Sequence, residues 1–205
     1  MEKDAKSDRC YRYDKIRSWP LIDGWSVNPD DPNFRVRIFP KAHLHPSVLL
    51  GRGVTIKSGA GVEAGAVVET WVTVGASVKI GAQSKVGIRT IIGSGATVGH
   101  RVTVEGYAMI GPGAVVGDWV VLGLGVKVGS DVVVGPRAVI RFGVLVGRGA
   151  EVGDKAVIGP RAVIGPRAVI GTRAVVGDDA TVRSDAVVDN GARVESRAVV
   201  KDDAY

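Results

Sequence analysis

A six-residue repeat runs without interruption from Ile38 to the last residue of this 205-residue chain. Every sixth residue is Val, Ile or Leu, beginning with Ile38, Leu44, Leu50 and Ile56, and all 28 such positions keep this phase. Four residues after each of them stands Ala, Val, Ser or Thr, and Gly usually follows the aliphatic residue directly. A repeat of fixed period outweighs single-residue propensities, because it determines the architecture as a whole. Each six-residue unit is called a hexad below.

A period of six fits neither an amphipathic helix nor a simple alternating strand. It predicts a triangular coil of three hexads, in which three short strands form the sides and three turns form the corners. The aliphatic and small residues point inward, while Gly and polar residues provide the turn conformations. Stacked coils pair each strand with the coils above and below, at about 4.8 Å per coil. Residues 38–205 therefore predict an all-β solenoid of about nine coils without loop insertions.

The composition suits such a core. Hydrophobic residues make up 45% of the chain, yet aromatic residues make up only 5% and Gly occurs 29 times, so Val, Ile, Ala and Gly must do the packing. This apolar content excludes an intrinsically disordered chain. The single cysteine, Cys10, excludes an internal disulfide framework and a cysteine-based zinc cage, and we interpret it as an incidental thiol.

Residues 1–37 are a different kind of sequence, with nearly half of the aromatic residues and mixed charge. The stretch 4–17 can form a short helix, and the Pro and Gly residues after it predict turns. The first coil of a solenoid exposes unpaired strand edges and an apolar interior, so we interpret this segment as a cap. A partner-binding arm is the alternative. The expected organisation is an N-terminal cap of residues 1–37 followed by a solenoid of residues 38–205.

Targeting signals, membrane segments and net charge limit the classes of protein to which this chain can belong. The first eight residues contain no apolar core of the kind that a secretory signal needs. No run of about 18 apolar residues predicts a membrane-spanning helix. The net charge of +6 is well below that of a dedicated nucleic-acid-binding protein. We therefore expect a cytoplasmic protein that binds no membrane, and the charge argues against nucleic acid as its partner.

Because three hexads complete a coil, residues separated by three hexads should stack in columns on the outside. One corner column holds Gln83, Arg101, Trp119, Arg137, Lys155 and Arg173, and another holds Trp71, Arg89 and Tyr107. Arginine and aromatic side chains at this spacing can stack as cation–π pairs. Three interpretations of the basic column stay open: a solvated corner whose Arg stems cover Gly and Ala, a site for the phosphates of a nucleotide cofactor, and a nucleic-acid surface.

The residue before each inward aliphatic one should face outward on the flat sides, and many of these residues are apolar. They form three rows, namely Val115 and Val133; Val121, Val139, Val157 and Val175; and Leu145 and Val163. Soluble monomers rarely expose such stripes, so we expect a homo-oligomer with closed symmetry. The last coil would also invite end-to-end association, unless the charges of Lys201, Asp202 and Asp203 protect it.

The repeat resembles that of the hexapeptide-repeat family over about four-fifths of the chain. The resemblance implies that the solenoid is a left-handed parallel β-helix and that the oligomer is the cyclic homotrimer usual in that family.

One stretch is more specific. Val68–Gly75 (VETWVTVG), with RIFP at 37–40 and GVEAG at 61–65, resembles tetrahydrodipicolinate N-succinyltransferase. That family carries a catalytic acid directly before a Thr-Trp pair, and the matching residue is Glu69. The resemblance implies transfer of an acyl group from acyl-CoA (succinyl-CoA or acetyl-CoA) to an amine that Glu69 orients or deprotonates. It also implies that the coenzyme lies in the groove between subunits, where its phosphates would meet a basic column: Arg101, Trp119, Arg137, Lys155 and Arg173.

His100 is the second candidate catalytic residue. Val98-Gly99-His100 resembles a fragment of the solenoid carbonic anhydrases, which bind zinc through three histidines. The two positions that would supply the other ligands are Ala64 and Glu105, so we expect no metal site.

Two functions from different classes remain. The first is a trimeric acyl-CoA-dependent acyltransferase with Glu69 and His100 at the subunit groove. The second is a non-catalytic structural or assembly solenoid, whose apolar stripes and aromatic N-terminal segment bind partner proteins. The unbroken repeat favours the second, because enzymes usually carry functional residues on loops. A counterpart of the succinyltransferases' second catalytic acid is also absent, since Met109 or Val115 stands at the aligned positions.

Overall fold

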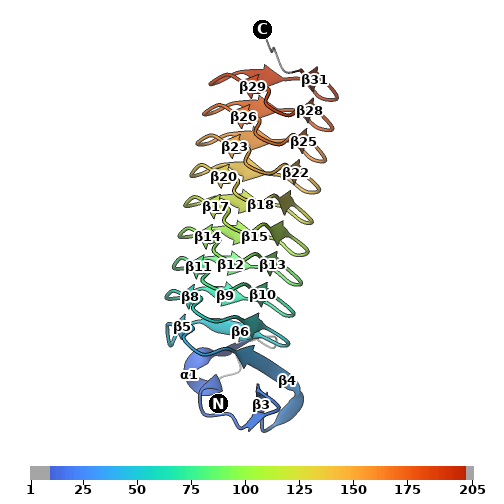
Figure 1. The fold of residues 1–205 in the computed structure, drawn as a ribbon. Helices are drawn as coiled ribbons and strands as arrows, with labels where there is room; N and C mark the ends of the chain where they lie inside the picture. Colours follow the sequence, from blue (N-terminus) through green and yellow to red (C-terminus); the bar gives the residue numbers. More distant parts are fainter. Residues whose placement is uncertain (1–9, 202–205) are drawn as a thin grey trace.

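The computed structural model describes residues 10–201. Within this range the chain forms a tall stack of triangular coils above a small N-terminal cap (Figure 1). Each coil consists of three short strands, and a strand pairs in parallel with its counterparts in the coil below and the coil above, three hexads away in either direction. The fold is a left-handed parallel β-helix, which confirms the solenoid predicted from the repeat and the hand implied by the family resemblance.

The three sides of the triangle are named in chain order. Face I is formed by β5 (His43–Leu44), β8 (Gly61–Val62), β11 (Lys79–Ile80), β14 (Thr97–Val98), β17 (Val115–Val116), β20 (Val133–Val134), β23 (Glu151–Val152), β26 (Val169–Ile170) and β29 (Val187–Val188). Face II is formed by β6 (Leu49–Gly51), β9 (Val67–Val68), β12 (Lys85–Val86), β15 (Thr103–Val104), β18 (Val121–Leu122), β21 (Val139–Ile140), β24 (Val157–Ile158), β27 (Val175–Val176) and β30 (Arg193–Val194). Face III is formed by β7 (Thr55–Ile56), β10 (Thr73–Val74), β13 (Ile91–Ile92), β16 (Met109–Ile110), β19 (Lys127–Val128), β22 (Leu145–Val146), β25 (Val163–Ile164), β28 (Thr181–Val182) and β31 (Val199–Val200).

Both inward positions of the repeat are buried along almost the whole stack, so the core is a column of aliphatic and small side chains. Two inward positions hold polar residues. Ser84 donates a hydrogen bond to the Gly99 carbonyl at 2.7 Å and accepts one from the Val102 amide at 3.0 Å. Thr90 donates to the Glu105 carbonyl at 3.3 Å. These hydroxyls are tolerated inside because each has a backbone partner.

The turns share one backbone feature. From Leu50 to Val194, the third residue after each inward aliphatic residue adopts the left-handed conformation, for example Trp71 with φ 62° and Gly53 with φ 70°. These residues lie at the three corners, which we name the I–II, II–III and III–I corners after the faces they join. Corner side chains therefore project outward and stack in columns with one member per coil.

Residues 10–38 lie at the lower end of the stack (Figure 1). β1 (Cys10–Arg12) pairs antiparallel with β6, and α1 (Tyr13–Ile16) buries Ile16 against the first coils. β2 (Leu21–Ile22), β3 (Trp25–Asn28) and β4 (Asp31–Ile38) form an antiparallel meander, and the end of β4 pairs in parallel with β7, so that it extends the sheet of face III by one strand.

An aromatic cluster fixes this cap. The rings of Tyr11, Trp19 and Phe34 meet edge to face, with centroids 4.7–5.7 Å apart. Such contacts add to the burial of the rings.

The helix expected over residues 4–17 is wrong at residues 10–12. There the backbone forms β1, because its amide and carbonyl groups pair with the free edge of β6. Helix is found only at Tyr13–Ile16, and residues 4–9 lie outside the described range. The expected protection of the last coil by Asp202 and Asp203 also falls outside it. Between residues 10 and 201, no helix has the length and apolar character needed to cross a membrane.

Candidate functional site

The I–II corner carries the basic column that the sequence predicts. Six successive coils place its members at the left-handed turn position: Gln83, Arg101, Trp119, Arg137, Lys155 and Arg173. Arg101 Nε donates a hydrogen bond to Gln83 Oε1 at 2.8 Å, and its guanidinium lies over Trp119, 4.5 Å from the ring centroid. The predicted cation–π stacking is therefore present at Arg101 and Trp119.

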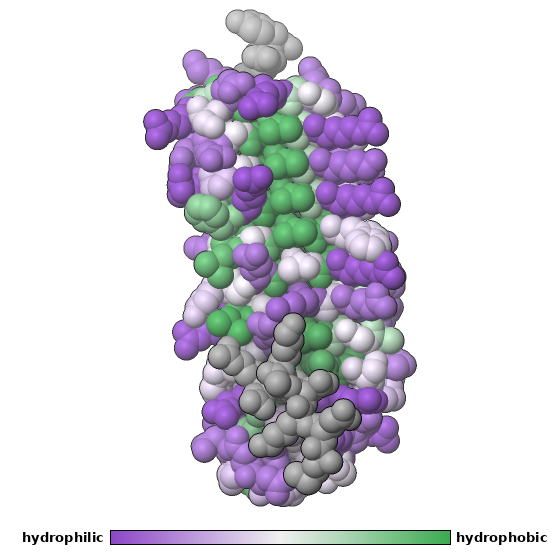
Figure 2. Space-filling view, turned by 180° about the vertical axis from the view of Figure 1, so that it is seen from behind, coloured by the Kyte–Doolittle hydropathy of each residue, from purple (hydrophilic) through white to green (hydrophobic). Residues whose placement is uncertain are grey.

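Three cations in the upper part of this column have no ion-pair partner. Arg137, Lys155 and Arg173 make no ion pair or hydrogen bond through their side chains to any residue between 10 and 201. At another corner, by contrast, Arg161 donates two hydrogen bonds of 2.7 Å to Asp179 one coil above. Cations stacked about 4.8 Å apart repel one another. Figure 2 shows long hydrophilic side chains stacked beside a hydrophobic stripe that runs along one face.

His100 lies at the same corner, directly before Arg101. The backbone amide of Ala82 donates to His100 Nδ1 at 3.0 Å and also to Glu63 Oε2 at 3.2 Å. Because Nδ1 accepts a hydrogen bond, the neutral ring carries its proton on Nε2. The 3.4 Å approach of Nδ1 to Glu63 Oε2 is therefore a contact of two acceptors that share one donor. In this arrangement His100 offers an N–H donor to a ligand and no free basic nitrogen.

Glu69 lies at the II–III corner, directly after β9. Its Oε1 forms an ion pair with Lys85 Nζ at 2.9 Å, and its Oε2 accepts a hydrogen bond from the Ile88 amide at 3.2 Å. The side chain is 27% exposed and lines a hollow of about 350 Å³. The two contacts hold a partly exposed carboxylate in one orientation, which suits binding of an ammonium group or acceptance of its proton.

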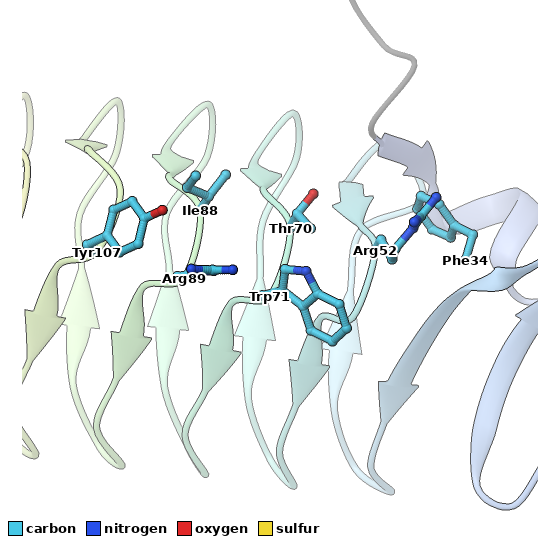
Figure 3. A pocket seen from close by; sticks show the side chains of 7 residues that line it. All are labelled: Phe34, Arg52, Thr70, Trp71, Ile88, Arg89 and Tyr107. Atoms are coloured by element: carbon cyan, nitrogen blue, oxygen red, sulfur yellow. The ribbon is translucent and has the colours of Figure 1, made fainter.

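A second hollow of about 410 Å³ lies at the same corner, nearer the cap (Figure 3). Its lining combines aromatic rings, guanidinium groups and two smaller side chains: Phe34, Arg52, Thr70, Trp71, Ile88, Arg89 and Tyr107. Ile88 and Tyr107 line this hollow as well as the one that contains Glu69, so the two hollows adjoin.

The residues predicted to form one site thus fall into two groups. His100 and the basic column occupy the I–II corner, whereas Glu69 occupies the II–III corner at the other edge of face II. The two candidate catalytic residues are separated along the axis by about 1.7 coils, or roughly 8 Å. A single chain does not bring them together.

Sequence reasoning missed three residues of the II–III corner. Lys85 pairs with Val67 of the coil below, so its outward side chain reaches Glu69 from the next coil. Arg52 stands three hexads before Thr70 and therefore lies one coil below it in the same column. The coil period predicts both neighbours. Phe34 belongs to the cap, and no periodic signal places it beside the groove.

Cys10 lies near this corner, on the strand β1. Burial raises the pKa of its thiol to about 11, and the negative charge of Glu69 acts in the same direction. The thiol is therefore protonated at neutral pH and is a poor nucleophile. For the part of the chain described, no cluster of three or more His, Cys, Asp or Glu side chains is placed to hold a metal ion.

Part of the repeat matches a known protein family. The family model described as "Bacterial transferase hexapeptide (six repeats)" matches residues 149–184. This segment of the repeat is similar in sequence to the hexapeptide repeats of bacterial transferases. The hexapeptide geometry continues over all three faces from β5 to β31. No curated protein gives a significant sequence match.

Solved structures support the fold. The UDP-N-acetylglucosamine O-acyltransferase from Moraxella catarrhalis has a TM-score of 0.52 at 18% identity, over 75% of this chain and 70% of that chain. A second UDP-N-acetylglucosamine acyltransferase has a TM-score of 0.51 at 15% identity, over 87% of this chain and 71% of that chain. At identities of 15–18% the likeness establishes the β-helix fold and not the activity, because one fold supports many functions.

Proposed function

We propose that this protein is an acyl-CoA-dependent acyltransferase that acts on an amine in the grooves between the subunits of a homotrimer. The observation that carries the proposal is the Glu69 carboxylate, which Lys85 and the Ile88 amide hold at the mouth of a hollow. Both similar structures compared above are acyltransferases, and the matching repeat is that of bacterial transferases.

The outer side of face II supports a trimer. From β18 to β27, its outward strand positions are occupied by valine in four successive coils: Val121, Val139, Val157 and Val175. A charged or hydroxyl residue interrupts the corresponding rows of the other faces, such as Glu151 on face I and Lys127 on face III. Burial of a valine stripe against two further copies removes apolar surface from water.

The symmetry of such a trimer would complete the site. When three parallel solenoids turn face II toward a common threefold axis, the I–II corner of each copy meets the II–III corner of the next. His100 and the basic column of one subunit then face Glu69 and Lys85 of its neighbour. The two groups that a single chain keeps apart would share each of three equivalent grooves.

The chemistry follows from these groups. Arg101 and the cations above it bind the coenzyme phosphates, and Glu69 binds the acceptor ammonium and takes its proton. The amine nitrogen then attacks the thioester carbonyl, so that a C–N bond forms while the C–S bond breaks and the thiolate leaves. The Nε2–H of His100 is placed to donate to the developing oxyanion. The second proton that the nitrogen loses ends on the coenzyme thiolate.

Calorimetric titration with acetyl-CoA and succinyl-CoA tests the first step. We expect Arg101→Gly to weaken coenzyme binding, whereas Lys41→Gly, at a left-handed position of the III–I corner, which lies outside the groove, leaves it unchanged. A folded trimer that binds neither coenzyme at millimolar concentration contradicts the proposal.

Turnover with an amine acceptor tests the second step. Glu69→Gln keeps the size of the side chain but removes the charge, so coenzyme binding should persist while the acylation rate falls about 10²-fold or more. Unchanged turnover in this variant would exclude Glu69 as the catalytic carboxylate.

A non-catalytic assembly solenoid is the second candidate, and the uninterrupted coil geometry from β5 to β31 favours it. Faces I and III retain exposed apolar residues, including Val133 and Met109. A trimer formed through face II would leave these residues in contact with water. Light scattering distinguishes the two functions. Association beyond a trimer without coenzyme binding supports the assembly role, whereas a lone trimer that binds coenzyme contradicts it.

A further inference from the structure

The hollow nearest the cap contains groups that acyl transfer does not use. Trp71, Arg89 and Tyr107 stack in three successive coils, and Arg89 lies 5.7 Å from the centroid of the Tyr107 ring. Arg52 and Phe34 complete the end of the groove nearest the cap (Figure 3). The hollow of about 410 Å³ lies within the range of small-molecule sites, which is roughly 300–1,000 Å³.

The backbone shows that these large side chains are not required by the fold. Their shared turn position has φ between 54° and 62°, where a side chain is disfavoured by about 1–2 kcal/mol. In the same column the coils immediately below and above use Gly53 and Gly125. The Trp71 ring lies over Gly53, where even a Cβ atom would overlap it. Other corners also carry side chains in this conformation, such as Gln83 and Ser77, so the cost is general to the repeat. What distinguishes this column is that three successive coils display an indole, a guanidinium and a phenol.

The electrostatics favour an anionic ligand. Arg89 makes no hydrogen bond or ion pair through its side chain with any residue of the range 10–201, and its guanidinium lies over the Tyr107 ring. Arg161, in the same column, is instead neutralised by Asp179. Figure 3 shows the Arg89 side chain directed along the groove toward Trp71. Its guanidinium therefore keeps donors for a ligand, with Arg52 as a second cation that is paired to Asp31 at 3.2 Å.

We propose that this groove binds a planar aromatic ring that carries an anionic group. The ring stacks on Trp71 or Tyr107, each of which is 49% exposed, and Arg89 holds the phosphate or carboxylate, while Arg52 adds positive charge at the end of the groove nearest the cap. Because Ile88 and Tyr107 also line the Glu69 hollow, a ligand bound in this way would extend toward the carboxylate. The bound molecule is then the acyl acceptor, a step that rests on the proposed function.

Calorimetry of the full chain without coenzyme tests the binding site. The probes are uridine 5′-monophosphate and 4-aminobenzoate, with uridine and inorganic phosphate as controls that lack the charge or the ring. We expect one anionic aromatic probe to bind at least tenfold more tightly than both controls, and the successful probe identifies phosphate or carboxylate as the anion. Equal or absent binding of all four compounds overturns the proposal.

Glycine variants locate the site without disturbing the backbone, because glycine suits the left-handed turn. Trp71→Gly and Arg89→Gly should each weaken binding of the successful probe at least tenfold, while Ser77→Gly, at a left-handed position of the III–I corner outside the groove, leaves it unchanged. Loss of affinity in Ser77→Gly alone would place the ligand at the III–I corner and overturn the proposal.

The same titrations separate this inference from the acyltransferase proposal. Probe binding in a protein that binds no acyl-CoA leaves the groove established and removes the acyltransferase. Acyl-CoA binding in a protein that binds no probe removes the groove as an aromatic anion site, while the acyltransferase proposal stands.

Discussion

At the scale of single residues, glycine serves two distinct purposes in this repeat. The sequence predicts Gly as a turn residue, and Gly95 at the left-handed corner position fits that role with φ 72°. Gly81, directly after an inward aliphatic residue, has no positive φ. A Cβ atom there would lie 2.6 Å from the Gly99 carbonyl carbon of the next coil. Glycine at this position therefore permits a close approach of two coils, which local turn preferences do not reveal, whereas coils with Glu69 or Glu105 at the equivalent position accommodate a side chain.

Two alanine substitutions separate these roles. Gly95→Ala should cost about 1 kcal/mol of unfolding free energy, because the new methyl group meets open space and only the left-handed conformation is penalised. Gly81→Ala should cost several times as much, because the methyl group collides with backbone that cannot move without separating two coils. Chemical denaturation of the two variants gives the comparison. Equal losses would show that backbone conformation, and not stacking distance, governs both positions.

At the scale of elements, each coil interacts mainly with its two neighbours, and charged corner residues contribute to that contact. Arg161 and Asp179 are one coil apart in one column, and Arg167 and Asp185 are one coil apart in another. Each arginine donates two hydrogen bonds of 2.6–2.7 Å to the carboxylate above it. The hydrogen bonds from the arginines lower the pKa of Asp179 and Asp185 below the ordinary value for aspartate.

These shifts predict how stability responds to acid. A lowered folded-state pKa stabilises the fold above the ordinary aspartate pKa of about 3.9, and this contribution is lost as the pH falls through the folded-state value. The free energy of unfolding of the wild type should therefore fall below about pH 4. The double variant Asp179→Asn and Asp185→Asn should show a shallower decline, measured by denaturation between pH 6 and pH 2. Asp189→Asn, whose side chain makes no ion pair with residues 10–201, should match the wild type; a parallel decline of all three proteins would contradict the prediction.

The strands also show which parts of the fold can be predicted from the sequence. The two inward positions and the strand pairs of the coils follow from one period, because each strand has its neighbours at the same spacing of three hexads. The cap has no such rule. Cys10–Arg12 becomes a strand only because the edge of β6 lies beside it, and that edge belongs to a distant part of the sequence, Leu49–Gly51. Local propensity favoured a helix there, and the long-range pairing prevailed.

At the scale of the whole molecule, the sequence predicts which residues of the candidate site stack in columns. It does not predict the hydrogen bonds of their side chains or the hollows between them. The period alone places Arg101, Trp119 and Arg137 in one line and Trp71, Arg89 and Tyr107 in another. The proton position on His100 depends on an amide of the neighbouring coil, and the groove beside Trp71 depends on the cap residue Phe34. Such features require side-chain geometry. The sequence columns also do not show which face meets a second subunit.

The face that contacts a second subunit decides whether His100 and the basic column meet Glu69 of a neighbour. Substitutions on the outer side of each face test which face it is. Val139→Asp on face II would place three carboxylates near one another at the threefold axis, where each would lose its hydration without gaining a partner. We expect sedimentation equilibrium to give the mass of a monomer for this variant and of a trimer for the wild type.

The matched control is Val163→Asp, at the equivalent outward position of face III. It should leave the trimer intact, because face III would then point away from the axis and its new charge would stay in water. The opposite result, dissociation by Val163→Asp and a persistent trimer in Val139→Asp, would place face III at the axis. The corners that meet would then be II–III and III–I, so neither His100 nor the basic column would face Glu69 of a neighbour. The shared-groove mechanism depends on face II for this geometric reason.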